Sequence, residues 1–421
     1  MIEIRPFKTY RYNSLKVKNL SRVVTPPYDV ITKEEQVMFY NLSRYNFIRL
    51  ILGKRYPSDT KGSNCYTRAR DFFKRWVKEG VLIKEKEDAI YVYEQRYRID
   101  GALKRRIGFI ALMRLKDFSS NLVFPHEKTF DEPKRDRFAL LKTVKANLSP
   151  IFNLFNDPGD KITTLLKNYT KNHKGILEIT DRDLVIHKLW QIKNRDVIKE
   201  IVESMRNKDI YIADGHHRYE AALEYKRLMQ RRDSKYLEEA PYNYIMVYFL
   251  DLNEDAVTIL PTHRIIWLKE DFKKEGMQQL LRKFFFLKRK KNLDVLITTL
   301  KCHRKKPYFF GLCQGAEDCF LLVPKTKAIF KKFMREIDVE ILHELIIDKI
   351  LRKDIIREIS YTRDLNYIKH LIKNDRNFIA FLLNPTRLSQ FKNAIREKIR
   401  LPHKSTYFYP KPLSGLVIHK F

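Results

Sequence analysis

The chain has 421 residues, and its 84 lysines and arginines outnumber its 51 aspartates and glutamates, which gives a formal net charge of +33. A hydrophobic fraction of 44%, with 13% aromatic residues, excludes a wholly disordered chain. The longest apolar runs, at residues 244–250 and 379–383, are too short to cross a bilayer. The first residues, MIEIRPF, lack the apolar core of a signal peptide, so we expect a cytoplasmic protein.

The excess of basic residues has two explanations. A surface with this charge attracts polyanions, which makes nonspecific nucleic-acid binding one of them. The other, which the composition favours, is drift toward Lys, Ile, Tyr and Phe with only 12 glycines, because drift charges the whole surface without selecting a partner. The cysteines form no CxxC pair and indicate reduced structural thiols; they are Cys65, Cys302, Cys313 and Cys319.

Patterns in the first part of the chain predict both helices and strands. Two prolines predict an extended turn without helix over residues 23–31. Apolar residues at helical spacing predict an amphipathic helix over residues 66–77. Alternating segments at 89–97 and 106–113 predict two paired strands, and a further helix is expected after Pro133.

The rest of the chain continues this alternation. Strands are expected at residues 209–213, 244–250, 256–260 and 377–383, and a helix at 216–229. Asp338 is expected to cap a helix that runs through residue 346. The interleaved elements predict an α/β or α+β fold.

A group of charged and imidazole side chains stands between the strand at 209–213 and the helix that follows. It consists of Asp214, Gly215, His216, His217 and Arg218. Free amides at a helix start favour anions, a glycine lets the backbone approach a ligand, and arginine can contact two phosphate oxygens. The pattern therefore predicts a phosphate-binding turn, in which Asp214 binds a cation, accepts a proton or caps the helix. Adjacent histidines seldom share one metal, which argues against zinc.

The segment IYIADGHHRYEAA resembles the phosphate-binding turn of the ParB/sulfiredoxin-like superfamily, in which free-serine kinases carry a DGHHR signature. The whole chain resembles a widespread bacterial and archaeal family known only as a domain of unknown function. The blocks that carry this resemblance are VVTPPYDVI at 23–31, PHEKT at 125–129, DR at 136–137, SPIF at 149–152, IADGHHRYE at 212–220, LPTHR at 260–264, ILHELI at 341–346, FLLNPT at 381–386 and KSTYFYPK at 404–411.

The resemblance implies a ParB/sulfiredoxin-like core with a mixed sheet, elaborated by N- and C-terminal segments. We expect an N-terminal segment at 1–85, a phosphate-binding core at 86–270 and a C-terminal α/β region at 271–421. The implied activity is an ATP-dependent kinase of a free small hydroxy amino acid, most simply L-serine, with ADP as the alternative donor and Mg²⁺ bridging the phosphates. The rival hypotheses are a ParB-like nucleotide-dependent nucleic-acid binder and a sulfiredoxin-like repair enzyme, the latter disfavoured because the turn has no cysteine.

By the same resemblance, Glu127 is the catalytic base, since a serine hydroxyl needs a carboxylate to accept its proton. A solvated turn is the other interpretation of this residue. Asp214 is expected to position Mg²⁺ or share the base role.

Three further segments carry candidate substrate-binding residues. They are Tyr28, Asp29, His263, Arg264, Lys404, Ser405 and Thr406. Each has a structural alternative: locking the N-terminal strand for the first two, surface salt bridges for the next two, and core packing of a C-terminal strand for the last three.

Overall fold

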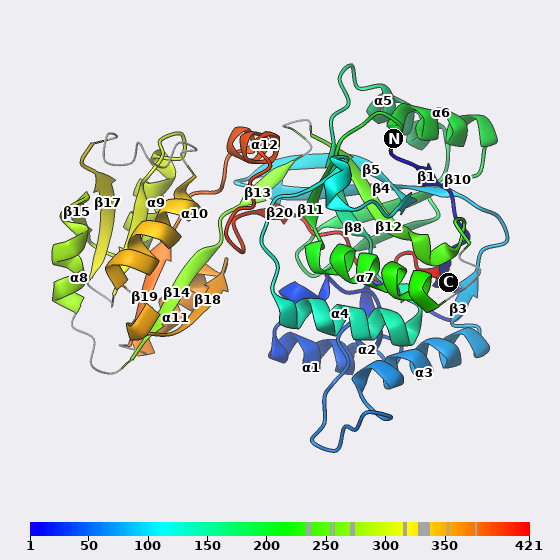
Figure 1. Ribbon diagram of the computed structural model, residues 1–421, viewed down its shortest axis with the longest axis horizontal. Coiled ribbons are helices and arrows are strands. Elements are labelled where there is room, and N and C mark those ends of the chain that lie inside the picture. The colour runs from blue at the N-terminus through cyan, green and yellow to red at the C-terminus, as the bar shows by residue number, and fades with distance from the viewer. Residues whose placement is uncertain are drawn as a thin grey trace. The chain divides into compact units, whose positions relative to one another are not determined.

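The structure is a computed structural model that describes residues 1–232, 237–252, 255, 257–269, 274–314, 318–326, 337–351, 353–374 and 377–421. The chain forms two compact units. The first contains residues 1–125, 129–257 and 410–421, and the second contains residues 126–128 and 258–409 (Figure 1).

A large mixed sheet forms the centre of the first unit. Its strands follow the order β6-β11-β8-β12-β5-β4-β10-β9, and β1 pairs with β5. The bounds are β1 Ile4–Arg5, β4 Ile90–Ile99, β5 Ala102–Arg114, β6 Val123–Pro125, β8 Ile151–Phe155, β9 Leu177–Thr180, β10 Ile186–Ile192, β11 Ile210–Asp214 and β12 Tyr244–Asp251. Because β11 is parallel to β6 but antiparallel to β8, the sheet is mixed, as expected for the α/β class.

The β4–β5 hairpin confirms the pair of strands expected from alternation. Ile99 pairs with Ala102, so only Asp100 and Gly101 form the turn. Both have positive φ, at 47° and 81°. An Asp-Gly pair suits such a tight turn because its twist matches that of the flanking strands.

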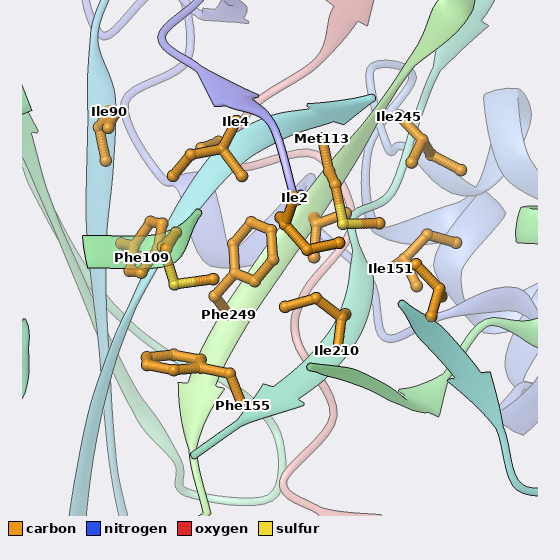
Figure 2. Close-up of a cluster of buried hydrophobic side chains, with 14 of the residues drawn as sticks. Ile2, Ile4, Ile90, Phe109, Met113, Ile151, Phe155, Ile210, Ile245 and Phe249 are labelled. Carbon is orange, nitrogen blue, oxygen red and sulfur yellow. The ribbon is translucent and has the colours of Figure 1, made fainter. Parts of the chain in front are cut away.

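Three helices pack against one face of this sheet and bury its apolar side chains. They are α5 (Lys161–Asn172), α6 (Arg195–Met205) and α7 (His216–Arg232). Figure 2 shows how side chains from separate strands, among them Ile151, Ile210 and Phe249, meet in this core. The core holds both the strand before the 214–218 turn and the helix after it.

A further group of helices belongs to the first unit. It consists of α1 (Lys33–Leu42), α2 (Ile48–Ile51), α3 (Cys65–Lys78) and α4 (Asp131–Val144), and α4 lies beside α7 (Figure 1). Asn64 caps α3 by accepting from the amides of Tyr66 and Thr67, a contact that contributes about 1 kcal/mol. The expected helix at 66–77 is confirmed. The short strand pairs of this unit are β2 (Tyr10–Tyr12) with β3 (Leu82–Lys84), and β7 (Ala146–Asn147) with β21 (His419–Lys420).

The second unit has an antiparallel sheet in the order β15-β17-β16-β19-β14-β18. The strands are β14 His263–Leu268, β15 Phe285–Lys290, β16 Phe310–Cys313, β17 Cys319–Pro324, β18 Ile356–Thr362 and β19 Phe378–Leu382, and a separate pair joins β13 (Thr258–Leu260) to β20 (Tyr407–Tyr409). The helices are α8 Lys274–Leu281, α9 Leu293–Cys302, α10 Asp338–Ile341, α11 Leu365–Asn374 and α12 Leu388–Arg396, with a π-helical segment at Leu342–Leu351. Two apolar clusters form its core.

Several sequence-based expectations need correction. A short 3-10 helix at Tyr28–Val30 follows the two prolines, where only an extended turn was expected. Asp338 is the first helical residue and not the cap, because its carboxylate accepts the amide N–H of Tyr308 at 2.7 Å. Helix α4 begins at Asp131, which places Pro133 in the first turn, where proline loses no helical hydrogen bond.

Two other expectations concern the remaining segments. The strand expected at 256–260 begins at residue 256, which lies outside the described residues, and strand β13 covers Thr258–Leu260. In the part of the chain that the structure describes, no helix has the length and apolarity needed to cross a membrane.

Candidate functional site

The turn at residues 214–218 joins strand β11 to helix α7, as the sequence predicts. β11 ends at Asp214, α7 begins at His216, and Gly215 between them has a φ of +94°. A Cβ on Gly215 would also lie 3.0 Å from the Arg218 guanidinium and 3.0 Å from Cδ1 of Ile151. Both the backbone conformation and the close packing therefore require glycine.

The Asp214 carboxylate is held between two cationic side chains. Nη2 of Arg218 donates to Oδ2 at 2.9 Å, and Nζ of Lys411 donates to Oδ1. Arg218 also donates through Nη1 to the carbonyl of Pro150 at 2.7 Å. Asp214 is only 8% exposed, so these are interior contacts. The ion-pair partners of this carboxylate are therefore side chains of the chain itself.

The histidines of the turn differ in their surroundings. His216 is buried, whereas His217 is half-buried and its Nε2 accepts the amide N–H of Phe130 at 3.1 Å. Nearby, Oγ1 of Thr129 donates to Oε2 of Glu220 at 2.9 Å. These contacts attach the residues before α4 to the first turns of α7.

Lys411 is a site residue that the sequence argument missed. It is the last residue of the KSTYFYPK block, whose first three residues were singled out instead. Its backbone carbonyl accepts from Nε2 of Gln95 at 3.2 Å, and the carbonyl of Pro410 accepts from Arg106. The sheet thus fixes the backbone that directs Lys411 toward Asp214.

A small, partly open pocket with a cavity volume of about 50 Å³ adjoins Arg218. Tyr28, Arg137 and Ser149 line it with Arg218 and with apolar side chains, so four of the quoted sequence blocks meet there. The Arg137 guanidinium lies 3.8 Å from the centre of the Tyr28 ring. Asp29, the neighbour of Tyr28, does not line this pocket.

Glu127 lies in the second unit and is 9% exposed. Its Oε1 accepts the amide N–H of Lys404 at 2.5 Å and lies 2.9 Å from Nδ1 of His403. The adjoining backbone is also fixed, because the amide of Leu401 donates to the carbonyl of His126 at 2.7 Å. The carboxylate is therefore built into the fold of the second unit and does not lie in a solvated turn.

Arg264 is fully buried in the same unit and holds the 403–404 backbone. Its guanidinium donates to the carbonyls of Thr262, His403 and Lys404, with the Lys404 contact at 2.9 Å. Burial lowers the pKa of Arg264 to about 10. The neighbouring His263 accepts the amide N–H of Leu383 at Nδ1, and burial lowers its pKa to about 4. Both side chains are therefore interior and do not lie at the surface.

The hydroxyl groups of Ser405 and Thr406 bond within the second unit. Oγ of Ser405 donates to the carbonyl of Pro402 at 2.5 Å, and Oγ1 of Thr406 lies 2.7 Å from Nε2 of His126. Both residues are buried. These contacts hold the segment that leads into strand β20.

The expected site residues thus form one group in each unit. The first unit holds the 214–218 turn, with Tyr28 at the adjoining pocket. The second unit brings together Glu127, Arg264 and residues 403–406.

The residues present offer a poor site for a metal held by the protein alone. Within the described ranges, no group of three or more His, Cys, Asp or Glu side chains could hold a metal ion. Both oxygens of Asp214 already accept from cationic side chains.

Comparison with solved structures finds proteins that are 10–12% identical to this chain. A free serine kinase mutant in complex with ADP is 11% identical, with 73% of this chain and 91% of that chain covered and a TM-score of 0.37. A conserved hypothetical protein from Pyrococcus furiosus is 12% identical, with 74% and 95% covered and a TM-score of 0.36. SbnI from Staphylococcus aureus, truncated at its C-terminus, is 11% identical, with 72% and 85% covered and a TM-score of 0.37.

TM-scores this low do not establish a common fold, so these structures are no basis for assigning an activity to this chain. No curated protein matches the sequence significantly. A family described as "Protein of unknown function (DUF1015)" matches residues 4–340. Because that match spans most of the sequence, the chain belongs to the DUF1015 family.

Proposed function

We propose that this chain is a nucleotide-dependent phosphotransferase whose 214–218 turn binds the phosphates of a magnesium nucleotide. One observation carries the proposal: a strand ends at Asp214, turns at Gly215 and enters a 17-residue helix, with Arg218 and Lys411 both bonded to the Asp214 carboxylate. The ParB/sulfiredoxin-like core implied by the DGHHR segment is the frame that we propose for this turn.

Several physical features support phosphate binding at this turn. The first amides of α7 have no partners inside the helix, and the helix dipole favours negative charge at its start. Gly215 leaves the backbone accessible at close range because it has no Cβ. Asp214 alone would repel an anion, and here its carboxylate is paired with both Arg218 and Lys411.

The acceptor in this proposal is a free small hydroxy amino acid, and L-serine is the one that the DGHHR resemblance indicates. A small pocket lies beside Arg218. Its Tyr28 and Ser149 come from two further blocks of the family resemblance. ATP is the proposed donor, with ADP as the alternative.

Glu127 is the carboxylate that we propose as the proton acceptor for the hydroxyl. Its Oε1 is fixed by Lys404 and His403, which is the kind of orientation that a general base needs. In this proposal Glu127 governs turnover, and the turn at 214–218 governs nucleotide affinity.

The experiment that tests the proposal is a transfer assay with the full chain. The protein is incubated with MgATP, or with MgADP, and a panel of L-serine, D-serine, L-threonine and L-homoserine, and products are followed by ³¹P NMR. A phosphomonoester signal that requires both protein and amino acid would support the proposal. Absence of any such product with every donor and acceptor, from protein shown to be folded, would overturn it.

A further inference from the structure

Lys411 is a charged side chain enclosed in the first unit. Its side chain is 7% exposed, and that of Arg218 is 13% exposed. Both donate to the Asp214 carboxylate, one to each oxygen. Of the three charges joined at the start of α7, two are therefore positive.

An interior cation is costly unless an anion compensates it, because burial removes the water that stabilises its charge. Arg218 has an unmet requirement of another kind, since its Nε is buried and has no hydrogen-bond partner among the described residues. The same side chain lines the pocket. An anionic ligand beside Arg218 would accept from this Nε, and Lys411 shares the Asp214 carboxylate with Arg218.

The C-terminal backbone around Lys411 is anchored on both sides. Before it, the Pro410 carbonyl accepts from Arg106, and after it the amide of Leu413 donates to the Tyr93 hydroxyl at 3.3 Å. Farther on, Ser414 exchanges two backbone hydrogen bonds with Thr25, at 2.8 and 3.2 Å. Lys411 is therefore held in place by the sheet and is not part of a loose tail.

From these contacts we propose that Lys411 is a phosphate-binding residue of the site, added by the last segment of the chain. The inference rests on the proposed function of the 214–218 turn and deepens it. An ammonium group has three N–H donors, so Lys411 can bond to Asp214 and to a phosphate oxygen together. Asp214 then orients the ammonium, and Arg106 acts as a positioning residue through the Pro410 carbonyl. The preferred ligand is a nucleoside di- or triphosphate, because its charge exceeds that of one carboxylate.

The competing explanation is that Lys411 only compensates Asp214 and attaches the C-terminal segment to the sheet. The two explanations differ in what happens when both charges are removed. If Lys411 serves only Asp214, the double variant Asp214→Asn/Lys411→Gln has lost a matched pair, and nucleotide binding survives. If Lys411 contacts phosphate, the double variant still lacks a ligand contact.

The test is a calorimetric titration of the full chain with MgADP and with adenosine, for the wild type, Lys411→Gln and the double variant. Lys420→Gln is the matched control, because this lysine lies in the same segment and its Nζ donates to the carbonyl of Phe421. Circular dichroism and thermal melting establish that each variant is folded.

We expect Lys411→Gln and the double variant to bind MgADP about 10- to 100-fold more weakly, the usual effect of one charge-assisted contact. Adenosine affinity should not change, and Lys420→Gln should bind MgADP as the wild type does. A double variant that binds MgADP as the wild type does would overturn the inference and leave the proposed function intact. A folded wild type that binds no MgADP would overturn both.

Discussion

Asp214 and Arg218 lie four residues apart on the chain, and the Nη2–Oδ2 distance between them is 2.9 Å. Side chains at this spacing meet on one face of a helix, and here the helix begins between them. The DGHHR order therefore has a local physical meaning. Asp214 at the end of the strand is paired with Arg218 in the first turn of the helix, and Gly215 bends the backbone so that the two side chains meet.

Replacing Arg218 tests the contribution of its guanidinium to nucleotide binding. We expect Arg218→Ala to weaken MgADP binding by about 1.5–3 kcal/mol, because a charge-assisted contact is lost. Arg227→Ala on the same helix is the control, since Arg227 is exposed and pairs with Asp117. Titration calorimetry of the two variants gives the comparison. Equal MgADP affinity in Arg218→Ala and Arg227→Ala would count against a phosphate-binding turn.

Asp214→Asn tests whether Asp214 pairs with the two cationic side chains or serves as a magnesium ligand. Because both carboxylate oxygens accept from cations, the substitution leaves Lys411 and Arg218 poorly compensated. We expect a loss of about 3–5 kcal/mol in unfolding free energy, measured by urea denaturation. Raising Mg²⁺ should restore neither this stability nor transfer activity. Recovery of activity at high Mg²⁺ would instead show that Asp214 is a metal ligand.

Glu127→Gln separates turnover from binding. The amide oxygen of glutamine can still accept the N–H of Lys404, but the side chain cannot take up a proton. Turnover should fall by about two to four orders of magnitude while nucleotide affinity is retained. Glu132→Gln, in the exposed first turn of α4, is the control. Near-normal transfer rates in Glu127→Gln would place the base elsewhere.

Acid should destabilise the protein through its buried histidines. Burial lowers the pKa of His263 to about 4, whereas an unfolded histidine titrates near pH 6.5. Between these values the unfolded chain binds a proton that the folded chain does not, so stability falls as pH drops from about 6.5 to 4. The pKa of His419 is also lowered by burial, to about 4, and acts in the same direction.

His263→Asn keeps an acceptor near the amide of Leu383 and removes the titration. Between pH 6.5 and 4.5 this variant should lose less unfolding free energy than the wild type, by on the order of 2–3 kcal/mol. The exposed His370→Asn is the control and should follow the wild type. Parallel stability curves for all three proteins would exclude His263 as a source of acid sensitivity.

The sequence predicted what is local in the first unit. The strand before Gly215 and the helix after it were expected, because the apolar run, the glycine and the helical spacing lie within a short stretch. The β4–β5 pair was also expected, since two alternating segments flank a tight turn. In these cases the neighbours that decide the structure are near in sequence.

Contacts between distant parts of the chain could not be predicted in this way. Lys411 reaches Asp214 across 197 residues, and nothing near either residue marks the other as its partner. The two compact units are not continuous in sequence, since the second includes residues 126–128 and the first includes residues 410–421. Asp338 fits the pattern of a helix cap, but its carboxylate instead accepts the amide N–H of Tyr308, which lies 30 residues earlier.

The central claim is that the 214–218 turn binds nucleotide phosphates. A crystal structure of the full chain with MgADP tests it most directly. The account predicts the phosphates at the start of α7, with the amides that follow Gly215 and the side chains of Arg218 and Lys411 within hydrogen-bonding distance. ADP bound elsewhere, with Asp214 still held by both cations and no phosphate at the helix start, would contradict it.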